Sequence, residues 1–534
     1  MKNHRATSCL LFAALAGIVL PGTARAVDFD PLRGIPRTLV RGGIANSPLR
    51  GQALQLLQRV DPTDVSPWSF SRYFLDKTMR IDYVHVGDAK EEFITLDRVL
   101  EQGAWAGSLK NLIDDYDTGR YFVKIYDEAS GGLIYSRGFD SYFGEYKTSG
   151  PALKGEKRAY FESALIPFPK ARIRFTVEIR GRDNALKPLF DRAIDPADLA
   201  IIREKPAAGV KIFEAHKSGD PHLKVDVAVL GEGYTRAEEA KFKADLDRVV
   251  ALLFREEPYR SLRDRLNVVG VLKPSEESGC DEPSHGSFKA TALGATFDSL
   301  GSERYVLTED NRSLRDIAGA VPYDALLIMI NHARYGGGGI YNYFCSFTVD
   351  NQWWEYLVLH EFGHSLAGLG DEYYTSDVAY NEFYPAGVEP TEPNITALLD
   401  PARLKWKEWA TPGLPIPAPW EKADFDAKDN AYQEIRREVN GRIAKMKRDK
   451  TPAGEIARAE AESERLSREH ADKVDAYLKA SKYRGTVGAF EGAGYAAQGL
   501  YRPALDCLMF TKGTKPLCKV CERTVVRVIR HYSE

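Results

Sequence analysis

One stretch constrains this chain more than any other: His360-Glu361-Phe362-Gly363-His364. Side chains four positions apart on a helix point the same way, so both imidazoles can reach one metal ion. Glu361, beside the first histidine, can take a proton from a water molecule on that ion. With only 10 histidines in 534 residues, such a pattern rarely arises by chance. The motif predicts a zinc site with a general base; the alternative is two helix histidines that are buried or solvated without metal.

Two histidines leave a zinc ion short of ligands, because a catalytic site usually takes a third from the protein and keeps water in the fourth position. Gly368 and Gly370 allow the chain to turn just after the helix, and Asp371 is the first ligand-capable group after that turn. A carboxylate is an oxygen donor that zinc accepts beside two imidazoles. We therefore expect both histidines and Asp371 to bind one catalytic Zn²⁺. Glu372 is the rival for the third place, and a distant glutamate on a following helix is a weaker one.

The first 26 residues have the pattern of a targeting segment. A basic start precedes an apolar run over residues 10–20, and Ala24-Arg25-Ala26 fits a small-x-small cleavage site. The run is too short to span a bilayer comfortably, which favours a cleavable signal peptide over residues 1–26. We expect an exported protein, secreted or periplasmic, without membrane insertion. The net charge of −3 gives no general attraction to nucleic acid.

Export changes the interpretation of the cysteines. Without Cys9 an odd number remains, and Cys518-x-x-Cys521 suggests a redox pair or half a zinc knuckle, but there is no second CxxC. We therefore favour structural disulfides, whose pairing the sequence does not determine. Asp and Glu are plentiful at 76 residues, yet no motif supports a structural Ca²⁺ site. The remaining cysteines are Cys280, Cys345, Cys507, Cys518 and Cys521.

The length of the chain predicts two or three domains. Residues 27–66 form a poorly patterned lead-in, and residues 67–194 contain short alternating strands with turn residues between them, which predict an antiparallel β-sandwich. Its aromatic side chains are expected to pack in the core, although they could line a ligand face. Residues 195–222 contain three prolines and are expected to be a linker.

Residues 223–534 predict a second domain, in which apolar strands alternate with amphipathic helices as in an α/β fold. Within it, the charged block of about 424–482 predicts a hairpin of two long helices that stands off the domain. This hairpin is either a solvated insertion or a partner-binding arm. The glycine run that includes Gly337 precedes an alternating strand, so it fits either an exposed edge where an extended peptide pairs or a flexible loop.

Several segments accompany the histidine motif and its glycine turn: residues 230–235, 335–339, 501–503 and 507–509. With them the chain resembles the IgA-peptidase family of metallopeptidases, relatives of the metzincins, from about residue 68 to the end. The resemblance implies a zinc-dependent peptidase with a metzincin-like α/β (α+β) domain after its own N-terminal domain. It also implies that Met509 forms the turn beneath the metal. Compared with the general metzincin pattern, the helix-ending glycine is one residue late, and Asp371 stands where histidine is commoner.

The expected chemistry is hydrolysis of a protein or peptide substrate by a metal-activated water, with Glu361 as general base. Tyr495 and Tyr501 are candidates to stabilise the oxyanion. One alternative is an exported protein that binds a surface glycan or another protein and has a structural or degenerate metal site. A hydrolase of a different amide is another. The substrate and the oligomeric state do not follow from the sequence.

Overall fold

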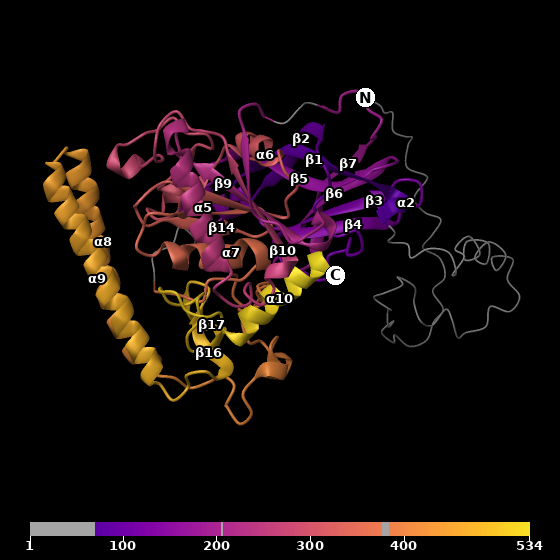
Figure 1. Ribbon diagram of the computed structural model, residues 1–534. Coiled ribbons are helices and arrows are strands. Elements are labelled where there is room, and N and C mark those ends of the chain that lie inside the picture. Colours follow the sequence, from indigo (N-terminus) through magenta and orange to yellow (C-terminus); the bar gives the residue numbers. More distant parts are fainter. Residues whose placement is uncertain (1–69, 204–206, 376–383) are drawn as a thin grey trace, which may run out of the picture. The chain divides into compact units, whose positions relative to one another are not determined.

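The structure is a computed structural model that describes residues 70–203, 207–375 and 384–534 (Figure 1). All of them belong to one compact unit, Pro67–Glu534. The predicted signal peptide, residues 1–26, and the lead-in of residues 27–66 lie outside the described residues. In the described part of the chain, no helix combines the length and the apolar composition needed to cross a membrane.

The N-terminal region contains two antiparallel sheets, with strand orders β2-β1-β5 and β4-β3-β6-β7. Apolar and polar residues alternate along these strands, so each sheet has one apolar face. Ile81 and Ile166 from the first sheet and Ile125 and Phe175 from the second lie in the same hydrophobic core, as in the two layers of a sandwich. The strands are β1 (Phe74–Gly87), β2 (Glu92–Glu101), β3 (Tyr121–Asp127), β4 (Leu133–Phe139), β5 (Arg158–Pro169), β6 (Ile173–Arg180) and β7 (Leu186–Ile194), with short helices α2 (Phe70–Tyr73), α3 (Tyr142–Tyr146) and α4 (Gly150–Leu153).

The rest of the chain is built on a six-stranded mixed sheet of order β14-β15-β13-β9-β10-β8. Its four inner strands are parallel, and the two edge strands are antiparallel to their neighbours. The inner strands are almost continuously apolar, because helices or loops cover both faces. Residues 211–216, within the segment expected to be a linker, form edge strand β8. The strands are β8 (Lys211–His216), β9 (Val225–Glu232), β10 (Leu266–Leu272), β13 (Ala325–Ile330), β14 (Gly337–Ile340) and β15 (Phe344–Thr348).

Helices pack on the two faces of this sheet. Val227 and Val229 of β9 share a core with α5 (Glu239–Leu253), α7 (Trp354–Ala367) and α10 (Lys519–Ser533). Leu230, which points to the opposite face, shares a second core with α6 (Asn311–Ala318) and with Tyr142 and Phe143 of the N-terminal region. Aromatic side chains of the N-terminal region are thus core residues, as expected, but part of that core belongs to the six-stranded sheet. Smaller elements are β11 (Ala295–Thr296), β12 (Leu307–Thr308), β16 (Val487–Ala493), β17 (Ala496–Ala504) and the 3₁₀ helices η2 (Pro221–Leu223), η3 (Arg236–Glu238), η4 (Arg263–Arg265), η5 (Pro283–His285), η6 (Ser299–Gly301), η7 (Pro401–Arg403) and η8 (Lys407–Trp409).

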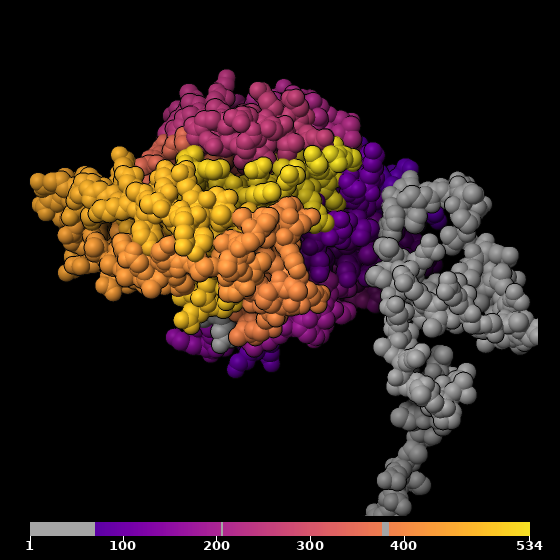
Figure 2. Space-filling view, turned by 90° about the horizontal axis from the view of Figure 1, so that it is seen from below, coloured from indigo at the N-terminus to yellow at the C-terminus, as the bar shows by residue number. Residues whose placement is uncertain are grey.

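The charged block forms two long helices, α8 (Lys422–Arg448) and α9 (Ala453–Ala480), which pack along Val439, Ile443 and Ala459. Figure 2 shows this hairpin, in orange and yellow, at one side of the domain.

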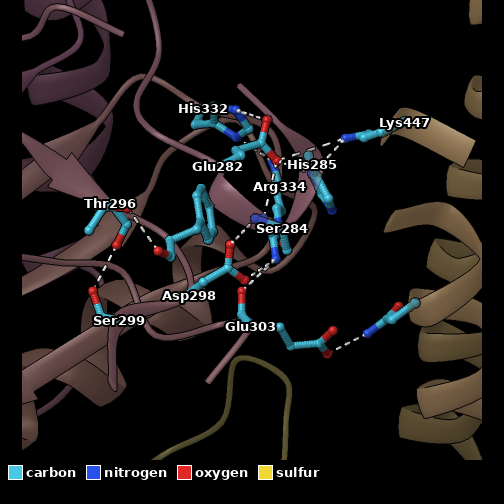
Figure 3. Close-up of polar contacts among 12 residues, drawn as sticks. Glu282, Ser284, His285, Thr296, Asp298, Ser299, Glu303, His332, Arg334 and Lys447 are labelled. Atoms are coloured by element: carbon cyan, nitrogen blue, oxygen red, sulfur yellow. Dashed lines mark hydrogen bonds and ion pairs between the residues drawn. The ribbon is translucent and has the colours of Figure 1, made fainter. Parts of the chain in front are cut away.

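The expectation that the hairpin stands off the domain is wrong, because polar contacts hold it along its length. Lys447 of α8 is 3.8 Å from Glu282 at the loop that carries η5 (Figure 3). Further along, the indole N–H of Trp353 donates to Ser467 Oγ of α9 over 3.2 Å.

Candidate metal centre

Helix α7 carries the histidine motif and ends in a way that the sequence explains. Gly368 has the left-handed backbone conformation, with φ of 61°, that glycine adopts without steric cost. Its N–H donates to the carbonyl of His364, and the next N–H, of Leu369, donates back to Gly363. This C-cap reverses the chain within a few residues, so Asp371 returns to the helix face that carries both histidines.

Three side-chain atoms converge on one point at this turn. Asp371 Oδ1 lies 2.9 Å from His360 Nε2 and 3.2 Å from His364 Nε2, and the two Nε2 atoms are 3.1 Å apart. Glu361 belongs to the same group, since ligand atoms of His360, Glu361 and His364 all lie within 4.8 Å of one another. Asp371 therefore brings its carboxylate to the histidines, and the rival Glu372 does not.

The second ring nitrogen of each histidine is already bonded to the backbone. His360 Nδ1 is 3.2 Å from the carbonyl oxygen of Leu508, and His364 Nδ1 is 2.5 Å from that of Leu369. A carbonyl can only accept, so each Nδ1 carries the proton, and in the neutral ring Nε2 presents a lone pair. The buried Oδ1 of Asp371 forms no hydrogen bond with any described residue. Two imidazoles with one carboxylate are a donor set that suits a divalent metal ion.

Burial and mutual charges shift the protonation of these groups. Burial lowers the pKa of His364, but Asp371 and Glu361 together raise it to about 9. Burial alone would raise the pKa of Asp371, yet the two histidines bring it well below its usual range. The pKa of Glu361 is raised, first by burial and then by the charge of Asp371, although both histidines act against this. Glu361 is thus a stronger base than an exposed glutamate, as a proton-accepting role requires.

Met509 and its neighbours form the floor of the site. Met509 is fully buried, and its carbonyl accepts the N–H of Glu372 over 2.8 Å. A methyl group added at Gly363 would lie 3.2 Å from the sulfur of Met509, so helix and floor are in close contact. Because the carbonyl of Leu508 also contacts His360, the segment 507–509 lies against the helix that carries the histidines; the turn that the resemblance implies at Met509 stays a prediction.

Strand β14 lies directly against α7. A Cβ at Gly339 would come within 2.5 Å of the carbonyl oxygen of Glu361, and one at Gly337 within 3.1 Å of the Glu361 side chain. The glycines therefore permit this close approach. The exposed edge predicted at Gly337 is partly covered, since the Gly337 N–H donates to Arg304 O and its carbonyl accepts from Val306 N. The alternative of a flexible loop is excluded for residues 337–340, because they form strand β14.

The two tyrosines considered for the oxyanion occupy different places. Tyr495 lines the same cavity as the histidines, and its hydroxyl donates to Asp371 Oδ2 over 2.6 Å. Tyr501 instead lies on β17, where its backbone pairs with Thr396 and its ring packs beside the core around Trp406. The structure thus brings Tyr495 to the metal centre and leaves Tyr501 away from it.

The histidines, Glu361 and Asp371 line a cavity of about 100 Å³. Other walls come from segments in which the sequence shows no local signal. Arg304 lies beside the site and donates to the hydroxyl of Tyr373 over 3.2 Å. Asp140 and Glu145 reach the cavity from the N-terminal region. No short motif marks these side chains, because the fold assembles them from distant parts of the chain.

The preference for structural disulfides is wrong in the described residues, where all five cysteines are free thiols. Three of them gather around Glu372: the thiol of Cys521 is 3.3 Å from Glu372 Oε1, and Cys507 and Cys518 complete the group. The CxxC pair thus lies beside Cys507, which precedes it by a short stretch of chain, and beside Glu372, which is remote in sequence.

A histidine pair with an adjacent glutamate base, inside a cavity of a mixed α/β domain, is the arrangement of a metal-dependent hydrolase. The chain belongs to the IgA Peptidase M64 family, whose model matches residues 213–529. A second model, Peptidase M64 N-terminus, matches residues 69–191. The protein is therefore a peptidase, and its resemblance to this family is confirmed. No curated protein matches the chain.

Proposed function

We propose that this protein is an exported, zinc-dependent endopeptidase with a metzincin-like catalytic domain. His360, His364 and Asp371 are its metal ligands, and Glu361 is its general base. One observation carries the proposal: the two Nε2 atoms and an unpartnered carboxylate oxygen meet within 3.2 Å, beside a half-buried glutamate. Two imidazoles and one carboxylate leave a fourth position for water, as in catalytic zinc sites.

Zinc, when bound, supplies an acidified water and polarises the carbonyl of the scissile bond. The protein's own groups transfer the proton and position the ligands. The carboxylate of Glu361 accepts the proton of the attacking water and transfers it to the nitrogen of the leaving amine. Burial raises the pKa of Glu361, which makes its carboxylate a better acceptor for the proton of the water. Tyr495 is a positioning residue: its hydroxyl holds Asp371 Oδ2, so Oδ1 faces the histidines.

Features of the fold support the metzincin-like assignment. An antiparallel edge strand, β14, lies along the helix that carries the motif, and a glycine cap ends that helix just before the third ligand. Met509 lies under the helix at Gly363. The departure in register is accommodated locally, because the C-cap at Gly368 gives Asp371 the reach to contact both Nε2 atoms.

Export rests on the pattern of residues 1–26 alone, and we propose removal of a signal peptide there. Cell fractionation combined with N-terminal sequencing of the mature chain tests this. A mature chain that begins near residue 27 outside the cytoplasm is the expected result, and an intact Met1 in the cytoplasm contradicts it.

The decisive experiment compares Glu361→Gln with Glu355→Gln. Both residues lie on α7, but Glu355 pairs with Arg255 outside the cavity and serves as the matched control. Loss of the general base is expected to lower kcat by about 10²–10⁴-fold on cleavable peptides while bound zinc is retained. The control is expected to keep full activity.

Full activity of Glu361→Gln contradicts the assigned base. Wild-type protein with stoichiometric zinc that cleaves nothing in a broad panel of proteins and peptides supports the rival function instead, an exported binding protein for a surface glycan or protein.

A further inference from the structure

The thiol group beneath the catalytic centre is the strongest feature that the peptidase chemistry leaves unexplained. The carboxylate of Glu372 and the sulfurs of Cys507, Cys518 and Cys521 all lie within 4.8 Å of one another. In a tetrahedral zinc site with Zn–S distances of about 2.3 Å, ligand atoms lie about 3.8 Å apart. The four groups are therefore already at the spacing that one metal ion needs.

The Glu372 carboxylate gives an independent indication of a ligand. Its side chain is fully buried, and Asn394 Nδ2 donates to Oε1 over 3.0 Å. The other oxygen, Oε2, is buried and has no hydrogen-bond partner among the described residues. An unpaired carboxylate oxygen in the interior is costly unless a charge compensates it. Arg502 is near enough to act on the charge of Glu372, but its hydrogen bonds go to backbone carbonyls.

Backbone groups and a helix end surround the thiols that would bind the metal. Cys518 is the N-cap of α10, and Cys521 lies in the first turn of that helix. The positive end of the helix dipole stabilises thiolates at this place. In addition, the N–H of Cys518 donates to the sulfur of Cys507 over 3.1 Å. Such N–H···S bonds and the Asn394 contact are the outer contacts that orient ligands in metal sites.

We propose that Glu372, Cys507, Cys518 and Cys521 bind a second metal ion, a structural zinc, beneath the catalytic centre. Three thiolates and one carboxylate close the coordination of zinc and leave no position for water, which distinguishes this site from the catalytic one. Soft sulfur donors select zinc over calcium or magnesium.

The proposed ion joins two segments of the catalytic centre to the start of α10. Glu372 directly follows Asp371, and Cys507 begins the segment that contains Leu508 and Met509. Leu508 orients His360, and Met509 accepts the N–H of Glu372. The ion thus clamps the third ligand and the floor of the active site to the start of α10. It also explains how three thiols stay reduced in an exported protein, because metal-bound thiolates are protected from pairing.

The test is metal analysis of the purified mature chain, with no activity readout needed. We expect about two equivalents of zinc in the wild type. A Cys518→Ser/Cys521→Ser variant is expected to retain about one equivalent, held by the histidines. A His360→Ala/His364→Ala variant is expected to retain about one as well, held by the thiols. Cys345→Ser, a buried cysteine outside the group, is the matched control and is expected to keep both.

A second measurement needs no variant and so does not depend on the folding of a mutant. Titration of the folded wild type with a mercurial thiol reagent, followed with a zinc indicator, should release zinc in step with the thiols of this group. Replacement by Co²⁺ in the His360→Ala/His364→Ala variant should give a thiolate-to-cobalt charge-transfer band.

Three results overturn the proposal: a disulfide between two of these cysteines in the purified protein, no zinc release by the thiol reagent, or a histidine variant that binds no metal. Each is separable from a failure of the peptidase assignment, because the histidine and cysteine variants report on different ions.

Discussion

At the scale of single residues, the candidate metal centre depends on how each proposed ligand is held. His360 and His364 have their Nδ1 atoms bonded to backbone carbonyls, so their rings cannot turn away from the site. Asp371 has no such backbone partner for Oδ1 and relies on Tyr495 at Oδ2. The third proposed ligand is therefore the one that side chains orient: Tyr495 and, through its own contact with Asp371, Tyr373.

Tyr495→Phe removes the hydroxyl that orients Asp371 and keeps the aromatic ring with its packing contacts. We expect the zinc affinity of the catalytic site to fall by about 10–100-fold, as for other outer partners of metal ligands. Competition with a graded series of chelators measures this. Tyr501→Phe on the neighbouring strand is the control, and an equal loss in both variants contradicts the role of Tyr495.

At the scale of elements, the close contact between α7 and β14 brings two walls of the candidate active-site cavity together. The strand approaches so closely that a side chain at Gly339 has no room beside the Glu361 carbonyl and His364 Cβ, at 2.5 and 2.7 Å. Both elements are rigid at this point, because β14 pairs with β15 and α7 packs on the sheet. Overpacking here cannot be relieved by a side-chain rotation.

Gly339→Ala is expected to lower the free energy of unfolding by about 1–3 kcal/mol, the usual cost of an inserted methyl group in a close-packed contact. Gly441→Ala, in the middle of α8 with open space around it, is the matched control and is expected to stabilise by about 0.5–1 kcal/mol. Urea denaturation of both variants measures the two effects. A neutral Gly339→Ala contradicts the tight contact.

At the scale of the whole molecule, the N-terminal region is part of the catalytic unit. It supplies Tyr142 and Phe143 to a core of the six-stranded sheet and Asp140 and Glu145 to the active-site cavity. Its own layer is held by a buried charged group, in which His85 of β1 contacts Glu162 of β5 at 3.1 Å and Glu92 of β2 at 3.0 Å. Stability of this layer therefore depends on the proton of His85.

Burial lowers the pKa of His85, but Glu162 and Glu92 raise it by more, so the net pKa is higher than in the unfolded chain. The folded protein therefore holds this proton more tightly than the unfolded chain. The resulting stabilisation is fully present below the unfolded pKa of 6.5 and is lost as pH rises through the raised folded pKa. His85→Gln should remove that part of the pH dependence. It should also cost about 3–5 kcal/mol at acidic pH, because two buried carboxylates lose their partner.

Denaturant unfolding of wild type and His85→Gln over a pH series measures this prediction. The difference in unfolding free energy between the two proteins should shrink as pH rises above 6.5. A difference that is constant with pH shows that the histidine is not protonated in the folded protein.

The sequence by itself determined the local parts of this protein. The helical repeat puts His360 and His364 on one face, and a glycine cap at Gly368 returns Asp371 to them; both follow from backbone geometry over a few residues. Alternating strands and apolar runs likewise predict the antiparallel N-terminal sheets and the α/β order of the second region, because side-chain periodicity reports burial.

Only the tertiary structure decided what depends on distant segments. It places Tyr495, and not Tyr501, beside Asp371. It also places Glu372 beside the cysteines and Asp371 beside the histidines, and it partly covers the β14 edge at Gly337. Asp371 and Glu372 are neighbours in sequence, yet their side chains contact different partners, the histidines and the cysteines. The burial of apolar surface over the whole chain decides which groups each side chain contacts, and no local pattern encodes that.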